Sequence, residues 1–536
     1  MTERRLIGRT AAPGLASGRV AVIGTEQTVR RVAGAPADEA QTLRRAIAAT
    51  LAEVTTLAGS ANGEAADMLG FQVALLSDDE LARPALAAIA GGASADSAWM
   101  AAMGAEIAGY GAAEDENFAA RTADLEDIRD RVCAHMAPGG ADAAIPDGAV
   151  VVGADLPLSR FLSIDWRRGG AIVLTRGSPS SHVAMLARAR KVPMVVGLGG
   201  SPEALAGHEA LVDAGAGEVV LTPDAATRVR FEARRGTAAV AAAALDTWRD
   251  GPGVTADGTR VAVHLNVGDP AELDGLDPAI CDGIGLVRTE LLFHGTAGLP
   301  DEAAQYEVYR RIAAWADGRP VTIRTLDAGG DKPIPGVTVD DESNPFLGLR
   351  GIRLSLRHPD LFRTQLRALA RAAVHGEVRI MLPMVTIPAE LEAARRMLDE
   401  SISDLARDCV PARRPMLGIM VEVPAAAIAI DRFDADFFSI GSNDLTQYVT
   451  AAARDIGTVA ELADPLNPAV LRLIAVVARH GREVGRDVSL CGDAGGEPKL
   501  VAHLLHAGLR SLSVAPAALA RAKQAIAGTD LRHPPP

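Results

Sequence analysis

The chain has 536 residues, too many for one ordinary hydrophobic core, and this length predicts about two or three domains. Its formal net charge of -14 argues against nucleic acid as a partner, so a site for a small anion would have to concentrate arginines locally. The sequence has no apolar run long enough to span a membrane and no closely spaced pair among its four cysteines, so we expect a soluble, cytoplasmic protein without disulfide bonds.

Two separated stretches of the first half carry the short apolar runs and glycine-rich turns of β-strands, residues 1–27 and 142–222. Residues 28–141, between them, are dense in Ala, Leu and Glu at helical spacing. Because strands on both sides of a helical block most simply belong to one sheet, we interpret this block as an all-helical domain inserted into a discontinuous strand-rich domain. Residues 223–250 contain neither Gly nor Pro over most of their length and predict a linker helix.

One histidine in the strand-rich domain is set apart by its surroundings. The stretch RGSPSSHVAMLARARKVPMVVG, residues 176–197, puts His182 behind a Gly-Ser-Pro-Ser-Ser turn and at the start of a short expected helix. Taken alone, such a histidine is most simply an ordinary N-terminal residue of a surface helix. Its role therefore depends on what the rest of the chain carries.

The second half, residues 251–536, contains eight apolar runs that each end in polar or ionisable residues. Most segments between them have helical patterning, and a segment of this size with this alternation is typical of a (β/α)8 barrel, or TIM barrel. An open three-layer sheet is the structural alternative. The expected strands lie in residues 261–266, 283–290, 321–330, 378–385, 416–424, 437–444, 488–493 and 512–516.

In such a barrel the active site lies at the carboxyl ends of the strands, so the polar residues that close the apolar runs are the candidates. Arginine side chains bind phosphate or carboxylate in a bidentate way, and Asp and Glu oxygens hold Mg²⁺. The set therefore suits a small, multiply charged anion with a divalent metal, although any single member could equally be a structural ion pair at the rim. The candidates are Arg288, Glu290, Arg324, Asp327, Glu422, Asn443, Asp444, Cys491 and Asp493.

Some residues stay ambiguous on spacing alone. Cys491 ends the seventh run, and a thiol there could be a nucleophile, a proton donor or a small core residue. Arg454 lies in a stretch that could be a loop or the start of a helix. We expect His264, His294 and His358 to be structural, because they show no ligand spacing.

Nine runs lie in this order along the chain: SSHVAMLAR, GIGLVRTELLF, RTLDAGGDKP, NPFLGLRGIR, MLPMV, GIMVEVPAA, DFFSIGSNDLTQY, NPAVLRLI and CGDAGG. Matching runs occur together, and in the same order, in the Enzyme I family of the bacterial phosphotransferase system, the phosphoenolpyruvate-protein phosphotransferases. The chain resembles this family over essentially its full length. The resemblance implies a multidomain α/β fold: a swivelling phosphohistidine domain with an inserted helical domain that docks the carrier protein HPr, followed by a phosphoenolpyruvate-binding TIM barrel that forms a homodimer.

The resemblance also implies roles for individual residues. His182 would accept the phosphoryl group of phosphoenolpyruvate and pass it to a histidine of HPr, with release of pyruvate, as the first step of sugar uptake. Cys491 would protonate the enolate carbon, and Arg121 falls in the motif of the HPr-docking domain. The Mg²⁺ ligands implied are Glu422 and Asp444, and the substrate-binding residues are Arg288, Arg324, Asn443, Asp444 and Arg454.

The chain departs from the family pattern at two places. Residues 177–181, Gly-Ser-Pro-Ser-Ser, replace the usual Gly-Gly-Arg-Thr-Ser before the histidine, so an arginine is lost and the turn is stiffer. Ala453 stands where the family usually has an Asp before its third substrate-binding arginine, which loosens the expected positioning of Arg454.

Two other functions fit parts of this pattern. Phosphoenolpyruvate synthase and pyruvate phosphate dikinase share the histidine domain and the barrel, but they need a large ATP-binding domain ahead of the histidine, where this chain is mostly helical. A non-enzymatic paralogue would bind partners without turnover, which the full set of candidate residues argues against. The sequence therefore favours a phosphoenolpyruvate-protein phosphotransferase.

Overall fold

The computed structural model divides into two compact units, Met1–Ala239 and Val240–Pro536, and the boundary between them falls inside helix α8 (Ala225–Asp246). Among the residues it describes, no helix combines the length and the apolar character needed to cross a membrane. The described residues are 3–23, 33–60, 64–111, 116–136, 145–179, 181–293, 299–330, 334, 336–339, 342–453 and 459–533.

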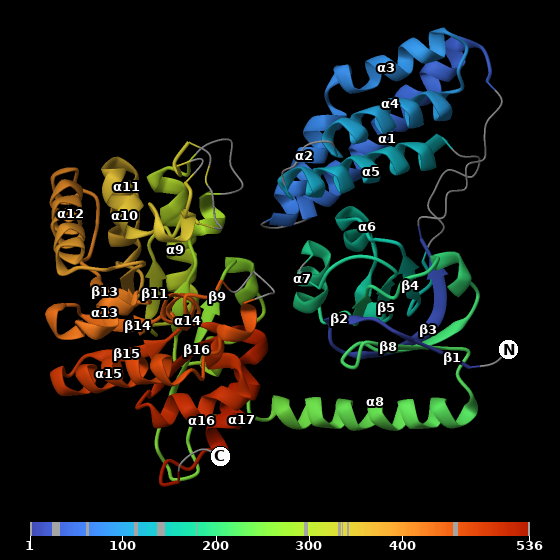
Figure 1. The fold of residues 1–536 in the computed structure, drawn as a ribbon. Coiled ribbons are helices and arrows are strands. Elements are labelled where there is room, and N and C mark those ends of the chain that lie inside the picture. Colours follow the sequence, from blue (N-terminus) through green and yellow to red (C-terminus); the bar gives the residue numbers. More distant parts are fainter. Residues whose placement is uncertain are drawn as a thin grey trace. The chain divides into compact units, whose positions relative to one another are not determined.

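The first unit is built around a sheet whose strands come from both sides of a helical segment (Figure 1). The strands are β1 (Arg4–Ile7), β2 (Arg9–Ala12), β3 (Leu15–Val22), β4 (Val150–Gly153), β5 (Ala171–Leu174), β6 (Met194–Val196), β7 (Glu209–Asp213) and β8 (Glu218–Leu221), in the order β1-β8-β7-β3-β4-β5-β6-β2. β3 pairs in parallel with β4 and antiparallel with β7, so a strand that precedes the helical segment lies between two that follow it. β4 (VVVG) and β5 (AIVL) are buried along their whole length, as expected for central strands.

The helical segment of the first unit has an apolar core of its own. Its helices are α1 (Pro36–Ser60), α2 (Glu64–Leu76), α3 (Asp79–Ala90), α4 (Ala95–Gly111) and α5 (Glu116–Met136). Leu43, Trp99 and Ile128 are completely buried at its centre. Arg131 of α5 links this helical segment to α6 (Leu158–Ser163), because its buried guanidinium donates to Ser159 at 3.1 Å. The other helices here are α7 (His182–Ala189), η1 (Trp166–Arg168) and η2 (Pro202–Leu205).

Eight parallel strands of the second unit close into a barrel (Figure 1). They are β9 (Ala262–Val267), β10 (Ile284–Val287), β11 (Val321–Arg324), β12 (Val378–Leu382), β13 (Met416–Val421), β14 (Phe437–Ile440), β15 (Asp487–Leu490) and β16 (Ser511–Val514). Each overlaps one of the eight expected apolar runs, so the barrel prediction is confirmed and the open three-layer sheet is excluded. The fold class expected from the sequence is therefore correct: a sheet domain with an inserted helical domain, followed by a TIM barrel.

Helices separate the barrel strands and begin at residues suited to that position. They are α9 (Glu302–Trp315), α10 (Ile352–Arg357), α11 (Pro359–Ala372), α12 (Pro388–Arg407), α13 (Pro424–Ile428), α14 (Ser442–Thr450), α15 (Pro468–Val484), α16 (Pro498–His506) and α17 (Leu519–Ala527). Asp301 caps α9 by accepting a hydrogen bond from the Ala304 N–H at 2.8 Å, and Asn467 caps α15 through the Ala469 N–H. Shorter helical turns are η3 (Pro270–Leu273), η4 (Pro278–Ile280), η5 (Glu290–Phe293), η6 (Pro345–Leu347), η7 (Ile430–Arg432), η8 (Ala460–Leu462), η9 (Asp493–Gly496) and η10 (Pro516–Ala518).

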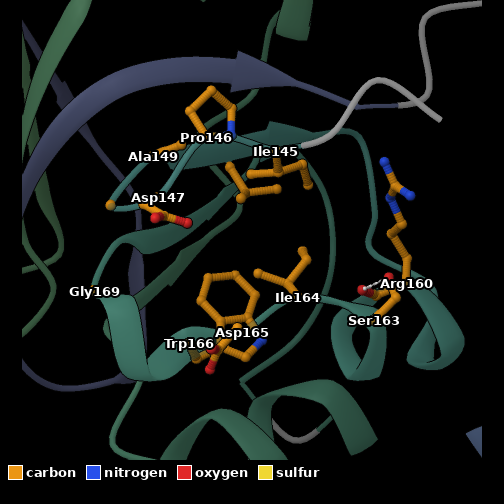
Figure 2. Close-up of a pocket in the computed structure, with 12 residues that line it drawn as sticks. Ile145, Pro146, Asp147, Ala149, Arg160, Ser163, Ile164, Asp165, Trp166 and Gly169 are labelled. Atoms are coloured by element: carbon orange, nitrogen blue, oxygen red, sulfur yellow. Dashed lines mark hydrogen bonds between the residues drawn. The ribbon is translucent and has the colours of Figure 1, made fainter.

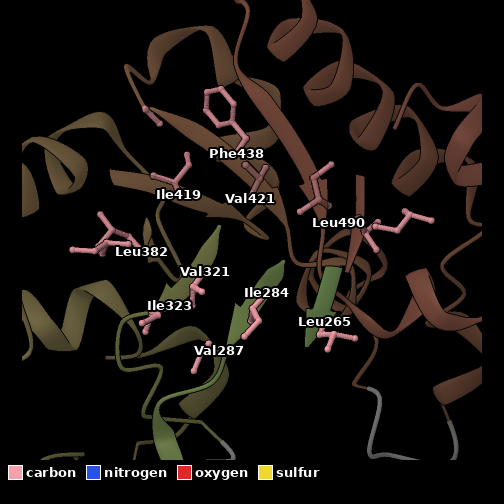
Figure 3. Close-up of a cluster of buried hydrophobic side chains, with 14 of the residues drawn as sticks. Leu265, Ile284, Val287, Val321, Ile323, Leu382, Ile419, Val421, Phe438 and Leu490 are labelled. Atoms are coloured by element: carbon pink, nitrogen blue, oxygen red, sulfur yellow. The ribbon is translucent and has the colours of Figure 1, made fainter. Parts of the chain in front are cut away.

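The main core of the second unit lies between the barrel wall and the surrounding helices. Alternate strand residues such as Leu265, Val321 and Phe438 belong to it (Figure 3). The residues between them face the barrel interior, because successive side chains of a strand point to opposite sides. The interior holds a smaller apolar cluster, made of Leu286, Met381, Met420, Phe437 and Cys491.

Candidate active site

Arg324, the last residue of β11, lies in a buried network of opposite charges at the carboxyl ends of the barrel strands. Its Nη2 donates to Glu290 Oε1 at 2.8 Å, and its Nη1 lies 3.0 Å from Asp327 Oδ2. Burial alone would lower the pKa of Arg324, but the neighbouring carboxylates raise it by more than that, so the guanidinium stays charged. Its Nε has no hydrogen-bond partner among the described residues, which leaves one buried donor for an anion.

Arg350 extends this network across the barrel mouth. Its Nε and Nη2 donate to the two carboxylate oxygens of Asp327 at 3.0 and 3.1 Å. The same guanidinium donates from Nη1 and Nη2 to Asp444, in the first turn of α14, at 3.4 and 3.2 Å. Arg350 is completely buried, so it ties together residues that follow the third and sixth barrel strands away from water.

Glu422 directly follows β13 and is almost completely buried. Its Oε1 accepts a hydrogen bond from the Met384 backbone N–H at 2.6 Å. Burial and the neighbouring carboxylates of Asp444 and Asp327 raise the pKa of Glu422 to about 8, although Arg324 and Arg350 oppose them. Neighbouring carboxylates that repel one another favour a divalent cation, whose charge would offset the repulsion.

Cys491 follows β15 and belongs to the apolar cluster inside the barrel. Its backbone N–H donates to the Ile440 carbonyl at 3.0 Å, and its Sγ donates to the same oxygen at 3.7 Å. Burial raises the pKa of Cys491 to about 11, while the charges of Arg324 and Arg288 lower it. The side chain is therefore a thiol at neutral pH, and the two arginines are close enough to affect it.

The other predicted barrel residues occupy different surroundings. Asn443 and Asp493 hold each other through a pair of hydrogen bonds, from Asn443 Nδ2 to Asp493 Oδ2 at 2.9 Å and from the Asp493 N–H to Asn443 Oδ1 at 3.1 Å. This pair links the first turn of α14 to η9. The side chain of Arg288 is exposed and forms no ion pair with a described residue. Arg454 lies outside the described residues.

The turn before His182 is held through its backbone. His182 opens α7, as expected, and Ser181 caps the helix by accepting from the Ala184 N–H at 3.3 Å. Arg9 Nη2 donates to the Gly177 carbonyl at 3.0 Å, and Arg188 Nη1 donates to the carbonyls of Pro179 and Ala11 at 2.8 and 2.6 Å. The side chains of His182 and Arg121, and the whole of Ser180, lie outside the described part of the chain.

Three known domains match the chain in sequence order. Residues 7–121 match the N-terminal domain of PEP-utilising enzymes, residues 145–217 match their mobile domain, and residues 242–531 match their PEP-binding domain. A phosphoenolpyruvate-protein phosphotransferase of Streptomyces coelicolor is 36% identical over 98% of this chain and 94% of its own length. The chain belongs to the phosphoenolpyruvate-protein phosphotransferase family.

Two further relatives support this assignment. The phosphoenolpyruvate-protein phosphotransferase of Haloferax volcanii is 41% identical over 76% of this chain and 73% of its own. The multiphosphoryl transfer protein of Rhodobacter capsulatus is 39% identical over 85% of this chain and 55% of its own. As a member of the phosphoenolpyruvate-protein phosphotransferase family the chain is a transferase that acts on a nitrogenous acceptor, and PEP-utilising enzymes need a divalent metal.

The donor set of this phosphotransferase fits a hard divalent cation. The described residues contain no group of three or more His, Cys, Asp or Glu side chains placed to hold a metal by themselves. Mg²⁺ commonly draws only one or two protein carboxylates and completes its shell with water and substrate oxygens. Glu422 and Asp444, whose charges interact strongly, match that requirement.

Sequence reasoning did not single out Arg350 in this phosphotransferase, although the network depends on it. Arg350 stands in the run NPFLGLRGIR, between η6 and α10, and does not close an apolar strand. The signal that points to it is the glycine that follows. Gly351 has a φ of 60°, and a Cβ there would lie 2.9 Å from Met384 Cβ, so this backbone is packed too closely for another residue.

A surface pocket in the first unit is separate from the residues predicted to act. It encloses about 270 Å³ and is lined by Arg160, Asp165, Trp166 and their neighbours (Figure 2). None of the described lining residues is a predicted site residue of the phosphotransferase. The predicted site residues lie instead at the barrel mouth and at the start of α7.

Proposed function

We propose that this chain transfers the phosphoryl group of phosphoenolpyruvate to His182 and then to a histidine of an HPr-type carrier protein, with release of pyruvate, as the first step of sugar uptake by a phosphotransferase system. The observation that carries the proposal is the buried network around Arg324, which keeps one donor unpaired beside strongly interacting carboxylates. Such a network is suited to a small anion that brings a metal with it.

Phosphoenolpyruvate would bind at the barrel mouth through positive charge and amide donors. Phosphoryl transfer through a loose transition state asks mostly for positioning and charge neutralisation. Arg324 offers its buried Nε, and Arg288 is exposed at the neighbouring strand end. We assign substrate binding to these two arginines together with Arg454, Asn443 and Asp444.

Mg²⁺ is the metal we propose for Glu422 and Asp444. Their oxygens are hard donors, which Mg²⁺ prefers over the nitrogen and sulfur ligands of zinc or copper sites. When bound, the ion would neutralise negative charge on the phosphoryl group. The task of the protein here is to hold the carboxylates, and the Met384 N–H fixes one oxygen of Glu422.

Cys491 is the proposed proton donor to the enolate carbon. A donor must carry its proton at neutral pH, and burial raises the pKa of Cys491 to about 11, which keeps it in the thiol form. The S–H bond would break as the C–H bond of the pyruvate methyl group forms, leaving a thiolate. A nucleophilic role would instead call for a lowered pKa.

His182 is the proposed phosphoryl acceptor. An unperturbed imidazole with a pKa of about 6.5 is mostly neutral at cellular pH and has a ring nitrogen free to attack. Unpaired backbone N–H groups in the first turn of α7 would favour the phosphoryl group once it is attached. We further propose that the helical segment α1 to α5, with Arg121, docks HPr, that the barrel forms a homodimer, and that the protein works in the cytoplasm.

The proposal is tested by incubating the full chain with phosphoenolpyruvate labelled in its phosphate, with Mg²⁺, and measuring acid-labile label on the protein. Wild type should take up label and pass it to added HPr, and His182→Ala should take up none. His208→Gln is the matched control, since His208 lies in the same unit and bonds to Thr222. Label that persists in His182→Ala would falsify the assignment.

A further inference from the structure

A side-chain hydroxyl joins the ends of β10 and β11 beyond their backbone pairing. The last register pair of these parallel strands is Val287 with Ile323. Past it, Thr289 donates from Oγ1 to the Arg324 carbonyl at 3.0 Å, and Thr289 is completely buried. This hydroxyl therefore ties together the two strand ends that carry Arg288 and Arg324, the arginines we assign to phosphoenolpyruvate.

Gln365 of α11 bonds to both of these strand ends from the surrounding helix layer. Its Oε1 accepts from the Leu326 backbone N–H at 3.0 Å. Because a backbone N–H can only donate, this bond fixes the orientation of the amide, and Nε2 donates to the hydroxyls of Thr289 and Tyr309 at 3.4 and 3.1 Å. Gln365 is 2% exposed, so all three bonds are made away from water.

The two hydroxyls that accept from Gln365 lead in different directions. Thr289 passes its own hydrogen to the Arg324 carbonyl at the barrel mouth. Tyr309, on α9, donates instead to Gln305 Oε1 at 3.2 Å, one turn earlier on the same helix. Tyr309 is completely buried, as Thr289 is. The same amide therefore has one partner that reaches the site and an equally buried partner that does not.

The spacing of these strand ends matters because phosphoryl transfer depends on positioning and charge neutralisation. In the proposed function, on which this inference rests, Arg288 and Arg324 bind the same small substrate from neighbouring strands. We infer that Thr289 and Gln365 are positioning residues, which hold the ends of β10 and β11 at the spacing that lets both arginines meet one phosphoenolpyruvate. Both act through the backbone beside the arginines, so neither has to contact the substrate. A loss of alignment costs more in the transition state than in the bound ground state.

The positioning role is tested by rapid-quench, single-turnover labelling of the full chain with phosphoenolpyruvate labelled in its phosphate, with Mg²⁺. This measures the maximal rate constant of transfer and the phosphoenolpyruvate concentration that gives half of it. Thr289→Val keeps the shape of the side chain without the hydroxyl, and should lower the rate constant by about tenfold while the half-saturating concentration changes by less than about threefold. Thr289→Ser keeps the hydroxyl and should return the rate constant to within about twofold of wild type.

Gln365→Met is the second variant, since it keeps the length of the side chain and removes its bonds to both strand ends. It should slow transfer to a similar extent, and the double variant with Thr289→Val should be no more than about twofold slower than either single variant, because both changes break one network. The matched control is Tyr309→Phe, which removes an equally buried hydroxyl from the same amide and should leave the rate constant within about twofold of wild type. Calorimetry shows that each variant is folded.

Two kinds of failure are separable in this experiment. A folded Thr289→Val or Gln365→Met protein with the wild-type rate constant would overturn the positioning role while leaving the proposed function intact. An equal loss of rate in Tyr309→Phe, or no recovery in Thr289→Ser, would do the same, because the network would then only stabilise the fold. Wild type that takes up no label would overturn the proposed function, and the positioning role with it.

Discussion

Arg324 and Arg350 differ in how many of their guanidinium nitrogens already have a hydrogen-bond partner. Arg350 donates from all three of its nitrogens to the carboxylates of Asp327 and Asp444. Arg324 keeps its Nε without a partner in the described part of the chain. Arg350 therefore organises the carboxylates, whereas Arg324 is free to bind an anion.

Arg324→Lys should lower kcat/KM for phosphoenolpyruvate by about 100-fold, because a single ammonium cannot pair with Glu290 and Asp327 and also present a donor to the substrate. Steady-state kinetics measure the loss. Arg310→Lys is the control, since Arg310 is partly exposed and, among the described residues, forms its ion pair with Glu307 on its own helix. Near-normal activity of Arg324→Lys would show that the planar geometry of the guanidinium is dispensable.

The sequence predicted those site residues that close an apolar run, such as Arg324 and Glu422. These residues could be predicted from single segments, because the carboxyl ends of all strands meet at one face of a barrel. Arg350 was not predicted, since its position depends on how a loop between η6 and α10 folds back onto other strands.

At the scale of single elements, β9 shows how one strand serves two environments. Its residues Val263, Leu265 and Val267 pack against the helices, and His264 lies between them on the interior side. Burial lowers the pKa of His264 to about 4, and its Nδ1 has no hydrogen-bond partner among the described residues. The barrel therefore holds this histidine neutral.

The neutral His264 makes stability depend on pH. The unfolded chain binds its proton below a pH of about 6.5, whereas the folded chain binds it only below about 4, so acidification between these values favours unfolding. We expect a loss of about 3 kcal/mol in the free energy of unfolding across this range from this residue. Urea titrations at several pH values should show a flatter profile for His264→Gln. Parallel profiles for wild type and variant would contradict the assignment.

The strands and helices were easier to predict from sequence than the contacts between them. Eight apolar runs with polar ends gave the eight barrel strands, and glycines divided the strands of the first unit. The pairing order of the first sheet was not predicted, because antiparallel contacts such as that between β1 and β8 join residues from opposite ends of the unit. Periodicity describes one element at a time and carries no information about its partner.

At the scale of the whole molecule, the two compact units have separate cores, and only α8 crosses their boundary. We therefore expect calorimetry to resolve more than one thermal transition. Arg350→Met should lower the free energy of unfolding of the barrel unit alone, by about 3 to 5 kcal/mol, because Asp327 and Asp444 would lose a buried partner. Arg353→Met, three residues away and partly exposed, is the control and should change little. A shift of every transition in Arg350→Met would indicate that the units unfold together.

The discontinuous first sheet has a consequence for how the chain is made. β1, β2 and β3 pair with none of each other, and every partner they have lies within residues 150–221. On the ribosome these strands emerge before their partners and stay unpaired, while the helical segment can collapse around its own local core. β1 and β2 end as the two outer edges of the sheet and carry Arg4, Arg5 and Arg9, charges that discourage pairing with a neighbouring nascent chain during that delay.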